Sequence, residues 1–434
     1  MRVLIATSSW PAHYFPMVPT GWALRAAGHE VRVLCAPRMT TVVENSGLSP
    51  VPLLDNGDPL FWSRVFHQRR VLAGTAQDNG LPLLHPLTGQ PMSSPDEFDF
   101  DTYQRANQRE QGALWWEATQ RIGRFVDAWQ PDLVLHDMMC NEGPACAIIA
   151  GAPAVLALWG LVGTHEPDPA LDLIPSYSNL FLDVIGVRGR GRQFISTVMD
   201  PCPKSLAPPT EAKRLPVQFV PYNGPGSAPP WAVERPQRRR IALTWGSTSG
   251  RHGPEAFMLP EILAGFAGLD ADIAVVIRPS DVAMLGDRLP DNATILPQCP
   301  LAELLPGCDA IVHHGGAGVV MTALACGTPQ LTVAYEEEQH ANGERVAGAG
   351  AGRVLRAGNA VDGTVIQAEL NRLLADEDAR AAALRLREEV AANPSPAQLV
   401  AELERVAAEG APPATVDWDR AREIERRLAG ARRQ

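Results

Sequence analysis

The sequence has no surplus of basic residues and no paired cysteine motif. Its 434 residues include 38 lysines and arginines against 49 aspartates and glutamates, which gives a formal net charge of −11. A nucleic-acid-binding face needs clustered positive charge, so this balance argues against a nucleic-acid partner, although it is compatible with a locally positive site for an anionic substrate. The seven cysteines form neither a C-x-x-C pair nor a cluster at zinc-ligand spacing. This pattern is typical of isolated thiols in a reducing cytoplasm.

Long hydrophobic runs are also missing, and no apolar stretch reaches the length of a membrane span. The first predicted strand begins at Arg2, so we expect no secretory signal peptide and a cytoplasmic protein. None of the better-known phosphate-binding motifs is present. What the sequence does contain is an ordinary hydrophobic content of 45% in a chain long enough for two domains, each of roughly 200 residues.

The first half of the chain alternates between predicted strands and helices. Strands are expected at Arg2–Ser8, Val31–Ala36, Pro131–Asp137 and Pro153–Trp159, with helices near Val18–Ala27 and Gly143–Ala150. Strand, helix and strand in this order predict a parallel, doubly wound α/β sheet. The region 55–111 is less periodic and carries several aromatic residues, which favours irregular or helical excursions over a binding face.

A proline-rich stretch interrupts this alternation, which then starts again. We predict a first domain over 1–215, a linker over 216–237, a second domain over 238–410, and a charged amphipathic helix over 411–434 that packs back on the first domain. Further strands are expected at Arg240–Ser247, Ala271–Pro279, Ala293–Pro297, Asp309–His314 and Pro329–Ala334. Two similar α/β halves predict their largest cleft between them.

The stretch HHGGAGVV, His313–Val320, lies where a predicted strand turns into a predicted helix. The start of a helix has backbone N–H groups without intrahelical partners and the positive end of the helix dipole. Glycine allows a ligand to approach that backbone closely. The stretch therefore suits an anion, above all a phosphate. The alternative is a tight turn that binds nothing.

Two other sequence patterns resemble ligand-binding motifs, but their positions do not support a ligand site. Ala347–Arg353 has the glycine spacing of a dinucleotide-binding fingerprint, but it follows a predicted helix, and the fingerprint requires the reverse order. D-x-D patterns, with which metal-dependent sugar transferases hold a divalent ion, occur at 99–101, 270–272 and 417–419. None clearly ends a strand of the first domain, so we interpret them as solvated acids and predict no metal site.

Three separated segments together resemble one family. They are Ser9–Val33, Thr244–Ser247 and His313–Gly350, and they are similar to the bacterial nucleotide-diphospho-sugar glycosyltransferases that attach deoxysugars to macrolides, anthracyclines and other natural products. The resemblance implies the GT-B fold, in which two Rossmann-like domains face a central cleft. It also implies metal-independent transfer with inversion at the sugar carbon, and a nucleotide sugar that is a co-substrate, so no cofactor is expected.

The resemblance implies a binding site for the donor diphosphate in the second domain. His314 and the backbone N–H groups of Ala317, Gly318 and Val319 would hold the diphosphate, with Ser247 as a further contact. A diphosphate leaves as a polyanion, and without a metal ion a helix N-terminus and an imidazole donor can stabilise its charge. Many relatives have threonine in place of Val319, so one side-chain contact is lost here.

Other donor contacts follow from the same resemblance. Glu338 and Gln339 match an acidic-glutamine pair that holds sugar hydroxyls, although the commoner acid is aspartate, and the alternative is an exposed loop. Relatives often stack an aromatic residue on the nucleotide base where this chain has Gln298. We therefore expect the backbone of Cys299 to recognise the base.

His13 and Asp137 match the catalytic pair of the family. His13 follows the first strand and Asp137 ends the strand Pro131–Asp137, so both lie at carboxyl ends of strands, where doubly wound sheets bind ligands. A histidine oriented by a carboxylate can deprotonate an acceptor hydroxyl. The alternative is a loop histidine that caps a helix. The acceptor is expected on the first domain, against Trp62 and Phe66 and near 161–165.

We therefore predict an inverting glycosyltransferase that moves a deoxyhexose from a nucleoside diphosphate, with dTDP as the expected carrier, to a hydroxyl group of a hydrophobic aglycone. A nucleotide-sugar epimerase of the same fold and a non-catalytic relative that acts as a binding partner are the alternatives. The resemblance also admits a separate activator protein and a homodimer. The acceptor, the sugar and the glycosylated atom do not follow from the sequence.

Overall fold

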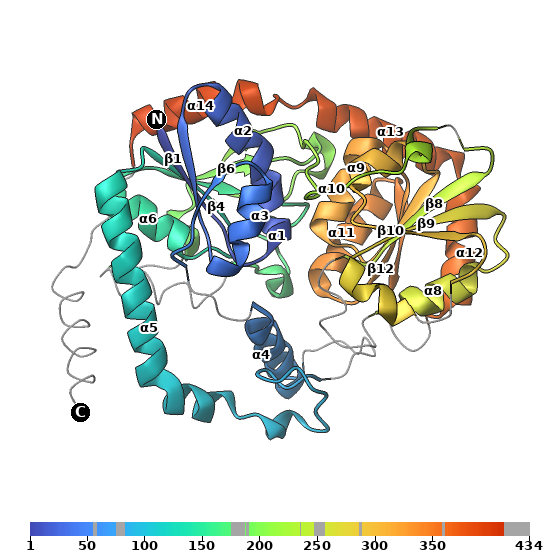
Figure 1. Cartoon of the computed structure of the whole chain (residues 1–434), viewed down its shortest axis with the longest axis horizontal. Helices are drawn as coiled ribbons and strands as arrows, with labels where there is room; N and C mark the ends of the chain where they lie inside the picture. Colours follow the sequence, from blue (N-terminus) through green and yellow to red (C-terminus); the bar gives the residue numbers. More distant parts are fainter. Residues whose placement is uncertain are drawn as a thin grey trace.

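The computed structural model describes residues 1–54, 59–74, 83–174, 187, 191–234, 236–246, 257–285, 289–357 and 361–411. They form two α/β domains that lie side by side (Figure 1). Within these residues, no helix is long and apolar enough to cross a membrane.

The first domain is built on a parallel sheet of seven strands. The strands are β1 (Arg2–Ala6), β2 (Glu30–Leu34), β3 (Ser49–Val51), β4 (Leu133–Asp137), β5 (Ala154–Ala157), β6 (Thr197–Asp200) and β7 (Lys213–Pro216). Their order is β3-β2-β1-β4-β5-β6-β7. Val3 and Ile5 of β1 face one hydrophobic core and Leu4 and Ala6 face another, so apolar layers cover both sides of the sheet. The helices next to this sheet are α1 (Pro11–Tyr14), α2 (Val18–Ala26), α3 (Thr40–Asn45) and α6 (Glu142–Ala150).

The second domain repeats this plan with six parallel strands. They are β8 (Arg239–Thr244), β9 (Ala271–Ile277), β10 (Ala293–Pro297), β11 (Ala310–His313), β12 (Gln330–Ala334) and β13 (Gly352–Arg356), in the order β10-β9-β8-β11-β12-β13. Its helices are α8 (Leu259–Phe266), α9 (Leu301–Leu304), α10 (Ala317–Cys326), α11 (Glu337–Gly348), α12 (Gly363–Leu374) and α13 (Glu377–Ala392). The predicted doubly wound α/β class is therefore confirmed.

Both sheets have a point where the strand order reverses. In the first sheet, β1 lies between β2 and β4, and in the second sheet β8 lies between β9 and β11. Connections from the two central strands diverge there and leave a crevice at the carboxyl ends, where such sheets bind their ligands. The residues that follow β1, β4, β8 and β11 are thus the ones that the fold places at the two crevices.

The chain passes between the domains twice. Between β7 and β8 the described residues contain the short 3-10 helix η8 (Pro230–Val233), within the segment predicted as a linker. Near the C-terminus, α14 (Pro396–Glu409) returns to the first domain (Figure 1). Its apolar side chains join the core that β1 faces: Leu399, Val400, Leu403 and Val406.

This return differs from the prediction. The sequence predicts that the second domain extends to residue 410 and that the chain crosses back in 411–434, but α14 crosses earlier. The reason is its continuous apolar stripe, which starts after a capping box at Ser395 and Gln398 and has its complementary surface on α2 and β4. The predicted helix 411–434 lies outside the described residues except for its first residue.

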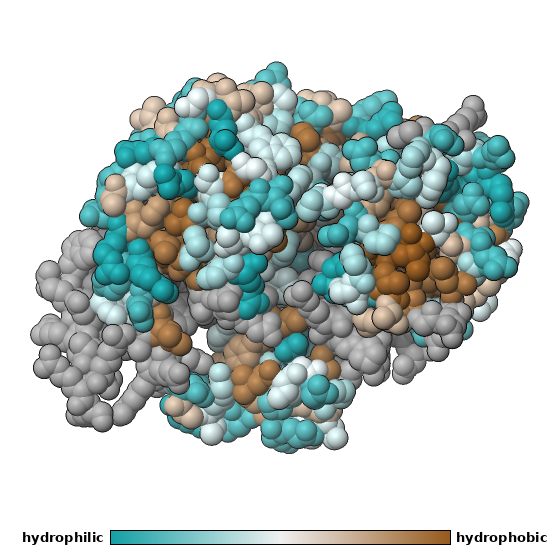
Figure 2. Space-filling model, viewed as in Figure 1, coloured by the Kyte–Doolittle hydropathy of each residue, from teal (hydrophilic) through white to brown (hydrophobic). Residues whose placement is uncertain are grey.

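An arm extends from the first domain between β3 and β4. It contains α4 (Pro59–Leu72) and α5 (Phe100–Trp129), and α4 lies below and between the two domains (Figure 1). Its aromatic rings pack on one another: Phe61 lies 5.3 Å from Trp62 and 6.5 Å from Phe98 between ring centroids. The arm therefore has a small core of its own, and Figure 2 shows further apolar side chains on its surface.

Candidate active site

Two polar side chains meet at the crevice of the first sheet. His13 lies on α1, directly after β1, and Asp137 is the last residue of β4. Nδ1 of His13 is 4.0 Å from Oδ1 of Asp137, which is a charge contact and too long for a hydrogen bond. The carboxylate of Asp137 is fully buried and accepts backbone N–H bonds from Ser8 at 2.6 Å and from Met139 at 2.8 Å. These bonds fix its orientation.

Ser8 connects this pair. Its hydroxyl oxygen lies 3.0 Å from Nδ1 of His13, while its backbone N–H binds Asp137. The side chain of His13 is 16% exposed. Burial lowers the pKa of His13 from 6.5 to about 4, and the charge of Asp137 opposes this shift. The imidazole is therefore neutral near pH 7 and able to accept a proton, with Nε2 as the ring nitrogen opposite the Ser8 contact.

Trp159 covers His13 from the end of β5. The two rings are stacked, with centroids 3.9 Å apart and planes inclined by 10°. The indole Nε1–H of Trp159 donates to Oε1 of Glu338 in the second domain at 2.9 Å. Burial raises the pKa of Glu338 to about 7, the bond from Trp159 opposes that rise, and nearby Glu336 adds to it. A continuous set of contacts thus joins the predicted base to a predicted sugar-binding residue.

His314 lies at the crevice of the second sheet, directly after β11. A Cβ atom at Gly246 would lie 2.4 Å from its Cε1, and one at Gly316 would lie 2.6 Å from its Nε2, so the ring fits between two glycines. The rings of Trp245 and Tyr335 have centroids 6.1 and 6.2 Å away. His314 is nearly buried, with 6% of its surface exposed. The two glycines therefore leave space for the imidazole of His314 at the N-terminus of α10.

The N-terminus of α10 provides backbone donors, with one difference from the prediction. The N–H of Val319 turns back to the carbonyl of Gly316 at 3.1 Å, so this amide is already engaged. The N–H groups of Ala317 and Gly318 are then the remaining predicted donors to an anion at this helix end. A Cβ atom at Gly160 of the first domain would lie 2.6 Å from Cβ of Ala317, so the two domains touch at this helix end.

The neighbouring His313 is held inside the second domain. Its Nε2 lies 3.0 Å from Oε1 of Gln330, and its Nδ1 accepts the N–H of Gly315 at 2.9 Å. Gly315 has φ of +95°, and a Cβ atom there would lie 2.6 Å from the carbonyl oxygen of Gln339. Only glycine fits this turn, which His313 braces and which directs His314 into the crevice.

Glu338 and Gln339 lie in the first turn of α11, not in a loop. Oε1 of Gln339 accepts the N–H of Tyr335 at 3.2 Å, and its Nε2 donates to Glu336 at 3.1 Å. Gln339 therefore has its side-chain amide committed to the protein, whereas Glu338 has one carboxylate oxygen bonded to Trp159. Glu338 is thus joined through Trp159 to His13 of the predicted catalytic pair.

The predicted base-binding residue follows β10. The thiol of Cys299 is buried in the second domain and donates to the carbonyl of Pro300 at 3.7 Å, so only its backbone can meet a base. Gln298 has φ of +56°, which turns the chain sharply at this point. Ser247, the remaining predicted diphosphate contact, lies outside the described residues.

The predicted acceptor residues lie on the arm. Trp62 packs against Phe66 and Phe100 at centroid distances of 6.3 and 5.6 Å, and Phe66 is 38% exposed. Arg70, also on α4, forms an ion pair of 3.1 Å with Glu337 of the second domain. The arm is thus attached to the helix that carries Glu338, and of the two predicted acceptor residues Phe66 is exposed and Trp62 is half-buried.

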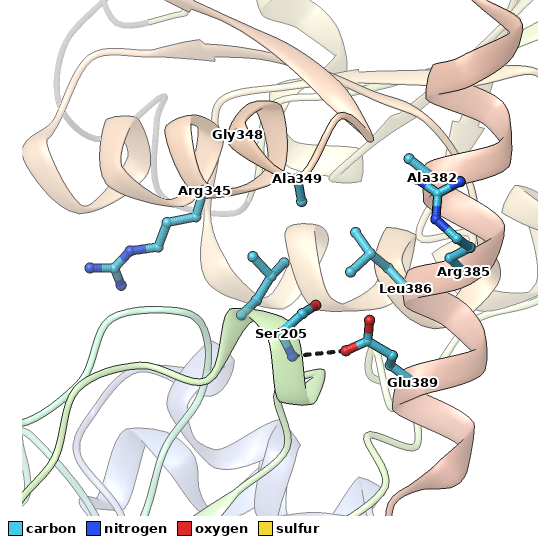
Figure 3. Close-up of a pocket in the computed structure, with 9 residues that line it drawn as sticks. Ser205, Arg345, Gly348, Ala349, Ala382, Arg385, Leu386 and Glu389 are labelled. Carbon is cyan, nitrogen blue, oxygen red and sulfur yellow. Dashed lines mark hydrogen bonds between the residues drawn. The ribbon is translucent and has the colours of Figure 1, made fainter.

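The segment 161–165 lies at the domain interface. Arg345 of α11 donates to the carbonyl of Leu161 and, at 2.5 Å, to the buried carboxylate of Glu166. Arg345 also lines a separate cavity of about 320 Å³, which lies between the segment of Ser205 and the helix α13. Figure 3 shows the residues around it, and there the N–H of Ser205 donates to Glu389 at 2.8 Å. None of the predicted site residues lines it.

Sequence reasoning did not identify Ser8 or Trp159. Ser8 had a visible signal, because it ends the first predicted strand beside His13 in the chain. Trp159 likewise ends a predicted strand, but its partner Glu338 is 179 residues away. The motif around the predicted diphosphate site gives no indication of either residue.

Comparison with known proteins places this arrangement in a family. Residues 92–246 and 260–406 match the N-terminal and C-terminal domains described as erythromycin biosynthesis protein CIII-like. L-demethylnoviosyl transferase of Streptomyces niveus is 34% identical over 93% of this chain and 97% of its own length. Tylactone mycaminosyltransferase of Streptomyces fradiae is 32% identical over 94% and 93%, respectively.

Solved structures of glycosyltransferases are also similar to this chain. Spinosyn forosaminyltransferase SpnP has a TM-score of 0.72 and 28% identity, over 94% of this chain and 99% of its own. Glycosyltransferase VinC in complex with dTDP has a TM-score of 0.70 and 29% identity, over 94% and 100%. The chain therefore belongs to the bacterial glycosyltransferases that attach deoxysugars to natural products, and it has their two-domain GT-B fold.

Proposed function

We propose that this protein transfers a deoxyhexose from a thymidine-diphospho-sugar to a hydroxyl group of a hydrophobic natural-product aglycone, with inversion and without a metal ion. Support for the donor comes from VinC, whose structure holds dTDP, and from relatives named as transferases of mycaminose and demethylnoviose. Support for a polycyclic or macrolide acceptor comes from relatives named for tylactone and for aklavinone.

The observation that carries the proposal is the link between the two domains. The His13–Asp137 pair lies on the first domain, the helix end with His314 on the second, and Trp159 joins the two through Glu338. An acceptor and a donor bound on opposite domains would meet at this link. A half-buried, neutral imidazole beside a carboxylate suits proton removal from a hydroxyl group.

The reaction would be a single displacement. The acceptor oxygen attacks the anomeric carbon while its proton passes to His13, and the bond from that carbon to the diphosphate oxygen breaks. The electron pair leaves with the diphosphate, whose charge the amides of Ala317 and Gly318 and the imidazole of His314 would stabilise. Attack opposite to the leaving group inverts the anomeric configuration. Asp137 would stabilise the imidazolium that forms on His13.

The experiment is a panel of thymidine-diphospho-deoxyhexoses combined with macrolide and anthracycline aglycones, with products identified by mass spectrometry. We expect a mass gain of one deoxyhexose for at least one pair, and NMR coupling constants that show an inverted anomeric centre. Activity in EDTA is expected to equal that in added magnesium. Retention of configuration would contradict the single displacement, and activity lost in EDTA and restored by metal would contradict the metal-free mechanism.

A further inference from the structure

Trp159 lies where the two domains touch, directly after β5. It is 3% exposed, and the next residue, Gly160, packs against the first residue of α10. A tryptophan in this position fills space between the domains. Its contacts are nevertheless specific, because each part of the indole meets a different predicted site residue.

The face of the indole meets His13 and its edge meets Glu338. The stacking distance of 3.9 Å and the angle of 10° restrict the imidazole to rotation within its own plane, and the Ser8 contact at Nδ1 restricts that rotation. The bond of 2.9 Å from the indole N–H occupies Oε1 of Glu338. Among the described residues, no hydrogen bond to the other carboxylate oxygen is found, so this oxygen could accept from a sugar hydroxyl. A donor to a carboxylate favours its ionised form.

Resting on the proposed function, we propose that Trp159 is a positioning residue that holds the base His13 and the sugar-binding Glu338 in a fixed relation across the domain interface. The stack sets the plane of the imidazole, and the indole N–H sets the orientation of the carboxylate. One rigid side chain thereby aligns the proton acceptor on the first domain with the sugar held by the second. Small errors in such alignment are costly to the rate of a displacement reaction.

Two substitutions separate the two contacts. Trp159→Phe keeps an aromatic ring against His13 but removes the N–H donor to Glu338, and Trp159→Leu removes both contacts. Trp22→Phe is the matched control, because Trp22 on α2 also donates its indole N–H, to the carbonyl of Ser46 at 2.7 Å, and is 41% exposed. Calorimetry measures the Kd of dTDP and of a thymidine-diphospho-deoxyhexose, and steady-state assays measure kcat.

For Trp159→Phe we expect about a 10-fold weaker Kd for the nucleotide sugar, the size of a lost hydrogen bond to a charged group. The Kd of dTDP is expected to stay unchanged, since dTDP lacks the transferred deoxyhexose that Glu338 would bind. For Trp159→Leu we expect, in addition, a kcat at least roughly 10-fold below that of Trp159→Phe, because the imidazole plane is no longer fixed. Trp22→Phe is expected to match the wild type in all three values.

The proposal is overturned if Trp159→Phe binds the nucleotide sugar as tightly as Trp22→Phe does. Equal weakening of dTDP and the nucleotide sugar would overturn it too, since that result means only a loosened domain interface. Equal kcat values for Trp159→Leu and Trp159→Phe would refute the stacking part, and if the leucine variant does not fold, the phenylalanine variant still decides the hydrogen-bond part. A wild-type enzyme that binds the nucleotide sugar and transfers nothing contradicts the proposed function instead.

Discussion

The hydroxyl oxygen of Ser8 lies 3.0 Å from Nδ1 of His13, closer than the nearest carboxylate oxygen of Asp137 at 4.0 Å. The direct hydrogen-bonding partner of the proposed base is therefore a serine. Asp137 acts on the imidazole by its charge, and its position is tied to Ser8 through the backbone bond of 2.6 Å. The familiar histidine-carboxylate pair is here a group of three residues.

Ser8→Ala is expected to lower kcat by about 3- to 10-fold, which is the usual worth of one hydrogen bond. The imidazole loses the contact that fixes its rotation but keeps the charge of Asp137. Initial rates at saturating donor and acceptor measure the effect, with Ser9→Ala as the control for a serine lost from the same loop. Equal rates for the two variants would show that Ser8 does not orient the base.

His13→Ala is expected to lower turnover by roughly 10²- to 10⁴-fold, the range of a lost general base. The Kd of dTDP is expected to stay the same, because the diphosphate site lies on the other domain. Asp137→Asn is expected to lower turnover by the same factor or by a smaller one. The double variant is expected to lose far less turnover than the product of the two single losses, since both residues act on one proton. A phenolic acceptor, which loses its proton more easily, is expected to show a smaller loss. Near-normal turnover of His13→Ala on an aliphatic hydroxyl would refute the assignment.

His314→Ala is expected to slow turnover on the order of 10²-fold and to weaken dTDP binding, because a donor to the leaving diphosphate is lost. The glycines on both sides of the ring have no side chains that could replace it. His340→Ala, on the neighbouring helix α11, is a histidine control outside the glycine-lined site. Calorimetry with dTDP and stopped assays measure the two effects. Unchanged dTDP affinity together with unchanged rate would remove His314 from the donor site.

The two perturbed groups predict separate pH effects on KM and kcat. Burial lowers the pKa of His13 to about 4, so the base form persists and kcat stays level as the pH falls from 8 toward 5. Burial raises the pKa of Glu338 to about 7, so its ionised form is lost below that pH and the KM of the nucleotide sugar rises.

Steady-state kinetics between pH 5 and 8 test this, with the Ki of dTDP as the reference for effects on the diphosphate alone. Glu338→Gln is expected to have a high KM for the nucleotide sugar, and this KM is expected to vary with pH no more than the Ki of dTDP does. A kcat that falls near pH 6.5 while KM stays level would mean that His13 titrates as an ordinary histidine.

Phe66→Ala on the arm is expected to raise the KM of the acceptor about 10-fold, since burying a phenylalanine ring is worth roughly 1.5–3 kcal/mol. Donor KM and Tm are expected to stay unchanged, because Phe66 is 38% exposed. Leu72→Ala, also exposed on α4, is the matched control. Trp62→Ala is expected to lower Tm, since Trp62 packs in the aromatic cluster. A change in donor rather than acceptor KM would place the acceptor elsewhere.

Local sequence patterns are sufficient to predict most of the fold. β1, β4 and β11 are short apolar runs, and polar residues end or directly follow each of them. The runs and the crevices at their ends can be predicted from the alternation of strand and helix. β6 and β7 were missed because each has only four residues in a region without helical or strand periodicity. The apolar stripe of α14 can be recognised in the sequence, but the surface of the first domain on which it packs cannot.

The sequence by itself determined that the chain has two doubly wound domains, that a glycine-rich turn precedes α10, and which polar residues end the central strands, because these features depend on neighbours in the chain. Only the tertiary structure decided which of these residues act together. Ser8 reaches Asp137 across 129 residues and Trp159 reaches Glu338 across 179. The first contact arises where β1 and β4 pair in the sheet of the first domain, and the second arises where one domain packs on the other. No local periodicity encodes the order of strands in a sheet or the relative placement of two domains.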